Sequence, residues 1–372
     1  MGNSTHFRLA DKSDDQAIRE LFRSSPMKGN MELSYDLAPS FFSALQAQGY
    51  NPHVVVAEKN NSLLACGTAL QRKVYVNGEA CEIGYLGGLR IGHGSRSSTI
   101  LARGYGFFKE INDNVMKVPF YLSSVAEDNH AAIKILTSGR AGLPSYHELG
   151  RYMTFAIPAA KINICRGVGR NLKIVKGSSM PFREILHFLN CEGCRKQFFP
   201  VLTEKDFSFP NGQLSTISHN DFLIACDRRG IIGTLALWNQ DSFRRIILEG
   251  YRGAIKGVKS LSSLISKTGI PDFLPDPGKP ISIRMASCIS VKDDNQEIFS
   301  SLLNSALEET MRAGSRFLLV GLPVHDPLVK CIRTPIKLRY ASRIYIVSWD
   351  SEYKINGHLD FNKNFYLDLG TL

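Results

Sequence analysis

One stretch of the sequence, residues 80–111, changes from the pattern of a strand to that of a helix across a turn of small residues. In its first part the side chains alternate between two faces, and the apolar residues of one face are Cys81, Ile83, Tyr85, Leu89 and Ile91. Gly84, Gly87 and Gly88 interrupt this strand, and glycines inside a strand usually mark a bulge or a close approach of a ligand. From Ser98 onward apolar residues recur at intervals of three and four, which predicts an amphipathic helix.

The turn between the two patterns, GHGSRSS, has the features of an anion-binding site. The first N–H groups of a helix have no partner within the helix and lie at the positive end of its dipole, so a phosphate can bind them where side chains are small. Arg96 adds a full positive charge. A strand that simply leads into a packing helix is the alternative, because such junctions are common in folds that mix strands and helices.

The composition predicts an ordinary globular chain of about two domains, with 372 residues of which 44% are hydrophobic and 21% charged. The first residues contain no apolar core, and nowhere do about 18 apolar residues run together, so we expect a cytoplasmic protein without a membrane span. The net charge of +11 favours anionic cofactors or substrates. Its densest clusters, residues 166–177 and 226–230, lack the interleaved aromatic residues of a single-strand binder, which argues against nucleic acid.

The eight cysteines are scattered, and most lie in apolar runs where a reduced, buried thiol is the usual state. Only Cys191 and Cys194 are close enough in the sequence to form half of a metal site. A zinc site needs four ligands, and the nearest histidines, His187 and His219, lack a paired spacing. We therefore expect no metal.

The predicted elements of residues 5–157 follow one another as strand, two helices, three antiparallel strands, the turn and its helix, strand, short helix and two closing strands around Gly150. Tight turns at Asn60–Asn61 and Asn77–Gly78 join the three antiparallel strands. Hairpins mixed with helices predict an α+β fold with a mixed sheet.

This order, together with the segments EIGYLGGLRIGHGSRSS and EDNHAAIKILTSG, resembles the GNAT superfamily of N-acetyltransferases. The resemblance implies that acetyl-CoA is the co-substrate and that the backbone of Leu89, Arg90 and Ile91 pairs with its pantetheine arm. It also implies a second group of cofactor-binding residues, at the start of the helix that follows the turn and at the start of the next helix: Arg96, Ser97, Ser98, Thr99 and Asn129.

The sequence departs from the family pattern at three positions. Counted from Arg96, the two small positions of the pyrophosphate loop are Thr99 and Leu101 instead of glycine. Seven residues after Asn129, where the family often has a tyrosine as general acid, stands Leu136, so an acid would have to come from elsewhere, such as Tyr121 or Tyr146.

A candidate base is Glu82 on the central strand. An amine must be neutral to attack a thioester, and a carboxylate could take its proton directly or through water. The alternative is that Glu82 faces solvent on a half-exposed strand. Glu127 and Asp128, at the end of the following strand, are weaker candidates.

The second half of the sequence repeats the order of elements more loosely, which implies two tandem GNAT-like units and a C-terminal extension: residues 1–160, 171–350 and 351–372. At the turn equivalent to GHGSRSS the second unit carries Asp293, Asp294 and Asn295, and acidic caps would repel a pyrophosphate. We therefore expect the second unit to hold no CoA and to shape the acceptor groove.

The expected function is transfer of an acetyl group from acetyl-CoA to a primary amine by direct attack, with backbone N–H groups near residues 89–91 stabilising the oxyanion. A non-catalytic GNAT-like protein that binds an acidic partner or ligand is the alternative. The acceptor, a small molecule or a peptide amine, and the oligomeric state remain open.

Overall fold

The computed structural model describes residues 5–27, 31–92, 98–159, 172–253, 256–257, 274–333, 338–350 and 359–372. The strands are β1 (His6–Leu9), β2 (Met31–Asp36), β3 (Tyr50–Lys59), β4 (Ser62–Val76), β5 (Glu79–Ile91), β6 (Tyr121–Ala126), β7 (Ser145–Pro158), β8 (Lys173–Lys176), β9 (Phe222–Asp227), β10 (Gly230–Trp238), β11 (Arg245–Tyr251), β12 (Ile283–Val291), β13 (Phe317–Pro323) and β14 (Leu338–Ser348). The α-helices are α1 (Asp15–Arg23), α2 (Phe41–Leu45), α3 (Ser98–Ile111), α4 (His130–Leu136), α5 (Phe182–Gly193) and α7 (Gln296–Arg312).

One 12-stranded sheet runs through both halves of the molecule, in the order β1-β3-β4-β5-β6-β14-β7-β13-β12-β10-β9-β8. In this order, the strands of the first half, residues 5–159, and those of the second half, residues 172–350, are arranged symmetrically about the central pair β14 and β7. Both contain antiparallel strands and one parallel pair, β5 with β6 and β12 with β13. The mixed sheet and the α+β class are thus confirmed, and β2 pairs with β11 in a separate ribbon.

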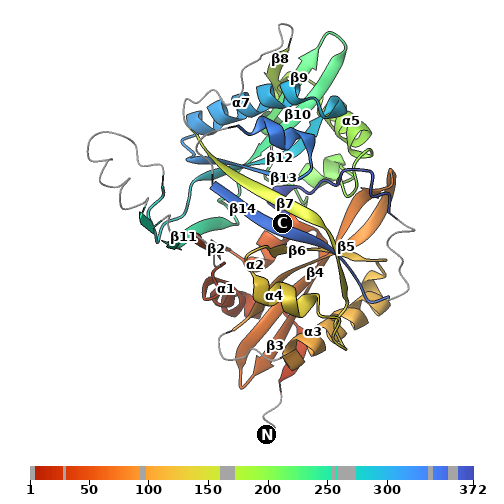
Figure 1. Cartoon of the computed structure of the whole chain (residues 1–372), viewed down its shortest axis with the longest axis vertical. Coiled ribbons are helices and arrows are strands. Elements are labelled where there is room, and N and C mark those ends of the chain that lie inside the picture. Colours follow the sequence, from red (N-terminus) through yellow and green to blue (C-terminus); the bar gives the residue numbers. More distant parts are fainter. Residues whose placement is uncertain are drawn as a thin grey trace.

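The two halves exchange their last strands. β7 belongs to the first half but pairs with β13, and β14 belongs to the second half but pairs with β6. The two exchanged strands also pair with each other, and Figure 1 shows β7 in yellow and β14 in blue crossing the middle of the molecule. Backbone hydrogen bonds therefore join the halves without a break.

Most of the predicted elements of the first half are present. Asn60, Asn61, Asn77 and Gly78 have the positive φ angles of tight hairpin turns, as their sequence predicts. The prediction of two closing strands was wrong, because β7 is one strand that passes through an irregularity opposite residues 344–345. The strand β2 was not predicted, although its apolar residues Met31, Leu33 and Tyr35 alternate with polar ones as in a strand.

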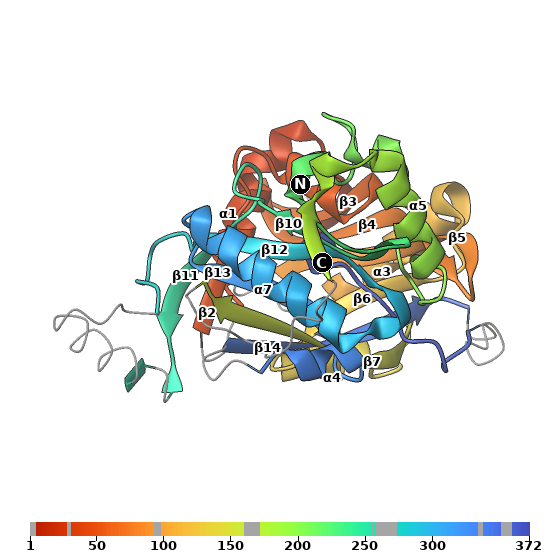
Figure 2. The same cartoon turned by 90° about the horizontal axis from the view of Figure 1, so that it is seen from above.

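Two hydrophobic cores lie on opposite faces of strands β3 to β6. The smaller core lies beneath α3, whose buried residues Leu101, Tyr105, Phe108 and Ile111 recur at intervals of three and four. The larger core begins beneath α1, with Ile18 and Phe22, and continues into the second half. Figure 2 shows α7 lying along the second half of the sheet. No helix among the described residues is long and apolar enough to cross a membrane.

Candidate functional site

The site is a gap between two neighbouring parallel strands. β5 and β6 pair only where residues 84–86 face residues 121–123. Beyond Leu86 they no longer pair, and a cavity of about 380 Å³ lies there, lined by residues 87–91 of β5 and 123–126 of β6. Unpaired strand edges present N–H and C=O groups that a ligand can bind. The gap therefore suits a ligand with amide groups of its own.

A β-bulge at Gly88 shapes the gap. Gly88 has a φ of +60°, and the pairing of β4 with β5 shifts register between Cys66 and Thr68. An added Cβ at Gly88 would lie 3.0 Å from the Thr68 methyl group and 3.1 Å from its hydroxyl, so a side chain here would crowd the cavity wall.

The bulge also changes which faces the following residues occupy. Leu89 and Ile91 pack with the core beneath α3, whereas Tyr85, before the bulge, packs with the core beneath α1. The expectation that Tyr85, Leu89 and Ile91 share a face was wrong, because one extra residue in a strand moves all later side chains to the opposite face. Arg90 consequently lies on the α1 side.

Opposite the bulge, the Cys66 thiol donates a hydrogen bond to the Gly88 carbonyl oxygen at 3.5 Å. Burial raises the pKa of Cys66 to about 12. The thiol therefore stays protonated near neutral pH and is a poor nucleophile, although it lines the cavity.

The wall on the α3 side contains Leu89 and Ile91, two of the residues expected to hold the cofactor. Leu89, Arg90, Ile91 and Asn129 all line the cavity, and the Asn129 side chain caps α4 by accepting a hydrogen bond from the Ala132 N–H at 3.2 Å. The other residues expected to bind the cofactor are not among the described residues of the cavity wall. Arg96 and Ser97 lie outside the described residues, Ser98 begins α3, and Thr99 is exposed on its first turn.

Two tyrosines form a pair at the same wall. The hydroxyls of Tyr105 and Tyr146 lie 2.6 Å apart, and both residues line the cavity. Burial raises the pKa of Tyr146 to about 12, so this phenol keeps its proton near neutral pH. Tyr121 instead donates to Asn112 at 2.8 Å and does not line the cavity. Of the two tyrosines considered as acids, only Tyr146 reaches the site.

The structure does not bring Glu82 to the cavity. Glu82 is exposed, accepts a hydrogen bond from the Tyr50 hydroxyl at 3.0 Å, and lies before the residues of β5 that pair with β6. Seven residues of extended strand, about 20 Å, separate it from Leu89. Its role as a base stays a prediction without support from its position.

The weaker candidate bases also lie outside the cavity. Glu127 forms an ion pair with Arg151 at 2.7 Å, and this hydrogen bond lowers the pKa of Glu127. Burial raises the pKa of Asp128, which does not line the cavity. Within the described ranges, no aspartate, glutamate, histidine or lysine contributes to the cavity wall.

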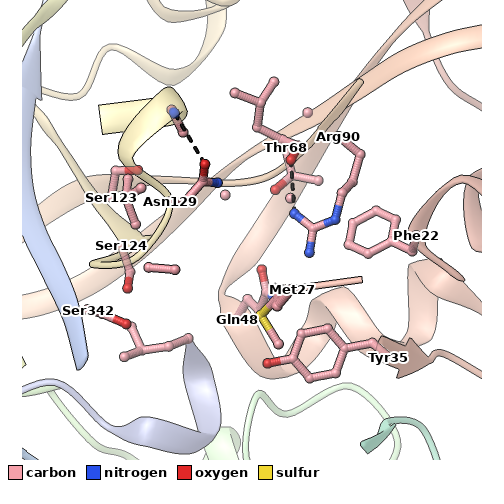
Figure 3. A pocket seen from close by; sticks show the side chains of 18 of the residues that line it. Phe22, Met27, Tyr35, Gln48, Thr68, Arg90, Ser123, Ser124, Asn129 and Ser342 are labelled. Atoms are coloured by element: carbon pink, nitrogen blue, oxygen red, sulfur yellow. Dashed lines mark hydrogen bonds between the residues drawn. The ribbon is translucent and has the colours of Figure 1, made fainter. Parts of the chain in front are cut away.

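The wall on the opposite side was not found from the sequence. It combines Phe22 of α1, Tyr35 of β2, Arg244 next to β11 and Tyr340 of β14, and Arg90 points toward this wall (Figure 3). Phe22 and Tyr35 come from the start of the chain, whereas Arg244 and Tyr340 come from the second half, and no local pattern marks the two pairs as neighbours. Strand exchange places β14 here, beside β6.

The second half contains an equivalent gap that is closed. β12 and β13 pair only where residues 283–285 face 317–319, and Cys288, at the position that matches Gly88, has a φ of +50°. The Asp368 carboxylate accepts a hydrogen bond from the Cys288 N–H at 2.8 Å, and the Tyr366 hydroxyl accepts one from the Ile289 N–H at 3.1 Å. Residues 366–371 therefore bind the strand edge that a ligand would use.

Cys191 and Cys194 show no metal site. The Cys191 sulfur lies 3.5 Å from His187 Nε2, but the described residues include no group of three or more potential ligands.

Searches with the sequence find no match, neither among protein-family models nor among curated proteins. Comparison of the structure with solved structures finds similar proteins. A GCN5-related N-acetyltransferase from Sphaerobacter thermophilus aligns with 99% of this chain and 98% of its own, at a TM-score of 0.58 and 11% identity. This chain has the GNAT fold.

Two further structures extend this likeness of the GNAT fold. Saccharomyces cerevisiae N-myristoyltransferase with bound myristoyl-CoA aligns with 93% of this chain and 83% of its own, at a TM-score of 0.54 and 10% identity. A glucosamine N-acetyltransferase region of a fungal GH3 β-N-acetylglucosaminidase aligns with 93% of this chain and 38% of its own, at a TM-score of 0.58 and 10% identity. At such identities the fold alone is shared, and function has to be argued from the site.

Proposed function

We propose that this protein is an acyl-CoA-dependent N-acyltransferase that transfers an acetyl group from acetyl-CoA to a primary amine. The observation that carries the proposal is the unpaired edge of β5 beyond Leu86, which opens into a cavity between the two sheet faces. This edge supplies amide groups for the pantetheine arm, and the cavity leads from α3 on one face to α1 on the other.

The cofactor would lie on the α3 side. The backbone of Leu89, Arg90 and Ile91 would pair with the pantetheine, which places the thioester beside the bulge. Arg96, Ser97, Ser98 and Thr99 would hold the pyrophosphate at the N-terminus of α3, where free N–H groups and the helix dipole favour an anion. Asn129 would border the same arm from α4.

The acceptor amine would then attack the thioester carbonyl directly. Backbone N–H groups near the bulge would stabilise the oxyanion, and breakage of the C–S bond would release a thiolate that Tyr146 can protonate. The raised pKa of Cys66 argues against a covalent acyl-enzyme. With no carboxylate in the described wall, the amine would bind neutral or lose its proton to water.

A second candidate function is non-catalytic binding of an acyl-CoA or of another anionic ligand. Leu136 stands where the resemblance leads one to expect a tyrosine, and it lines the cavity. This leucine, together with the lack of a carboxylate among the described residues of the wall, favours binding without turnover.

Calorimetric titration with acetyl-CoA, followed by an assay of CoA release with a panel of amines, separates the candidates. We expect micromolar binding to the wild type, weaker binding to Arg96→Ala, and CoA release that Tyr146→Phe slows. Binding without CoA release for any amine would favour the non-catalytic function. Absence of binding at millimolar acetyl-CoA would reject both forms of acetyl-CoA recognition.

A further inference from the structure

The α1 side of the cavity contains a half-buried positive charge, that of Arg90, for which the described residues provide no counterion. The Arg90 guanidinium lies 4.6 Å from the centre of the Phe22 ring, and its Nη1 donates to the Leu89 carbonyl oxygen at 2.9 Å. Its Nε is buried and has no hydrogen-bond partner in the described part of the chain. No aspartate or glutamate among the described residues lies within ion-pair distance of Arg90.

The other buried arginines of this region differ from Arg90. Arg244 donates from Nε to the Gln240 side chain at 2.9 Å, from Nη1 to the Leu372 oxygen at 2.7 Å and from Nη2 to the Gly370 oxygen at 2.6 Å. Arg72 donates to the backbone oxygens of Gln48 and Thr371. Both guanidiniums are held by the fold itself, whereas Arg90 makes one side-chain hydrogen bond to a described residue, the bond to Leu89.

Aromatic hydroxyls lie on the same side of the cavity. Tyr35 of β2 and Tyr340 of β14 both line it, and Figure 3 shows Tyr35 and Arg90 on one side, away from Ser123, Ser124 and Asn129. Among the described residues, Tyr340 has only a 3.8 Å contact from its hydroxyl to the Met27 sulfur. A guanidinium and phenols facing a cavity whose described lining residues include no acidic side chain favour an anion with planar oxygens.

We propose that Arg90, assisted by Tyr35 and Tyr340, binds the carboxylate of the acyl acceptor, so that the acceptor is an amino acid or a similar small amino-carboxylate. This inference rests on the proposed function, because it assigns the acceptor to the α1 side and the cofactor to the α3 side. The bulge separates these two sides, since Leu89 and Ile91 face α3 while Arg90 faces α1. The apolar residues around Arg90, including Phe22 and Met27, fit an acceptor with an apolar side chain.

The experiment compares matched acceptors that differ only in the carboxylate. Leucine and isoamylamine are tested with acetyl-CoA in the wild type, in Arg90→Met and in Arg90→Lys, with Arg339→Met as control for an exposed arginine at the cavity wall. We expect the wild type to prefer leucine in kcat/KM by roughly 30-fold or more, as a charge-assisted bidentate pair implies. Arg90→Met should abolish this preference, Arg90→Lys should restore part of it, and Arg339→Met should retain it.

Two binding measurements separate this inference from the proposed function. Calorimetry of acetyl-CoA should give the same affinity for the wild type and Arg90→Met, and a clear loss in the variant would overturn the inference by assigning Arg90 to the cofactor. If the wild type does not bind acetyl-CoA, the proposed function fails. The carboxylate site is then judged by titration with leucine alone, and binding that does not depend on Arg90 contradicts it. Equal use of leucine and isoamylamine by the wild type contradicts it as well.

Discussion

The gap between β5 and β6 and the gap between β12 and β13 have the same backbone arrangement, but the first holds a cavity and the second is filled by the chain itself. In each, a parallel pair ends after three residues, and a residue with positive φ follows: Gly88 two positions after Leu86, and Cys288 three positions after Met285. In each, a side chain of the adjoining strand donates to the carbonyl oxygen of that residue, Cys66 to Gly88 and Thr234 to Cys288. The first gap opens into a cavity, and the second is filled by residues 366–371.

The difference shows that strand divergence alone does not make a ligand site. The edge of β12 has its hydrogen bonds satisfied by Asp368 and Tyr366, and Cys288 places a side chain where Gly88 has none. The sequence led us to expect that the second unit holds no CoA because of Asp293, Asp294 and Asn295. The structure supplies an additional physical reason, since the chain itself occupies the strand edge.

The largest expected effect comes from breaking the closed gap. Asp368→Ala removes the acceptor of hydrogen bonds from Ser287, the Cys288 N–H and the Gly370 N–H, all in buried surroundings. We expect the free energy of unfolding in urea to fall by about 3 kcal/mol. Asp241→Ala, at an exposed position, should change it by less than about 0.5 kcal/mol. A loss of the same size in both variants would show that residues 366–371 do not hold the second gap shut.

The next effect comes from making the open gap resemble the closed one. Gly88→Cys introduces the side chain that Cys288 carries, and its Cβ would crowd Thr68 at the cavity wall. We expect the affinity for acetyl-CoA, measured by calorimetry, to fall about 30-fold, or ~2 kcal/mol. Gly106→Ala on α3, where an added Cβ meets nothing within 4 Å, should bind as the wild type does. Unchanged affinity in Gly88→Cys would place the cofactor elsewhere.

The reverse substitution, Cys288→Gly, tests whether the residue at the bulge alone determines if a gap is open to a ligand. Removing a fully buried side chain should lower the free energy of unfolding by about 1 kcal/mol, because relief of the positive φ offsets part of the lost packing. The stoichiometry of acetyl-CoA should stay at one per chain, since Asp368 and Tyr366 still occupy the strand edge. A second binding event in the titration would contradict this account.

The smallest effect is on how the free energy of unfolding depends on pH. Burial raises the pKa of Asp368 above its ordinary 3.8, so its contribution to stability is largest below that value and decreases as the pH rises through the folded-state pKa. The hydrogen bond from Arg8 lowers the pKa of Asp14, so the contribution of Asp14 is present above the ordinary value and is lost as the pH falls. Unfolding curves of Asp368→Asn and Asp14→Asn between pH 3 and 7 should therefore deviate from the wild type with opposite slopes. Slopes of the same sign would contradict these assignments.

The sequence predicted the fold better than the site because the fold depends on local patterns. Hairpin turns such as Asn77–Gly78 and the apolar spacing of α3 are properties of short segments, and both are confirmed. The resemblance identified Leu89, Ile91 and Asn129 from this local order of elements, and all three line the cavity.

The rest depends on contacts between distant segments. Glu82 was chosen for its place on the central strand, but only the register with β6 shows that it lies far from the gap. The bulge at Gly88 reverses the faces of later residues, which alternation alone cannot reveal. Tyr35, Tyr340 and Asp368 lie in segments that are far apart in the sequence. Strand exchange and the packing of the final residues bring these segments to the two gaps, and no spacing in the sequence encodes this.

The exchange of β7 and β14 has a consequence for fragments of this protein. A chain cut between residues 159 and 172 would give one piece that ends with β7, whose partners β13 and β14 are on the other piece. The other piece would carry β14, whose partners β6 and β7 are on the first. Each fragment alone would expose unpaired sheet edges, while the two together would complement one another, so mixing would restore the sheet and neither piece would fold as a complete unit.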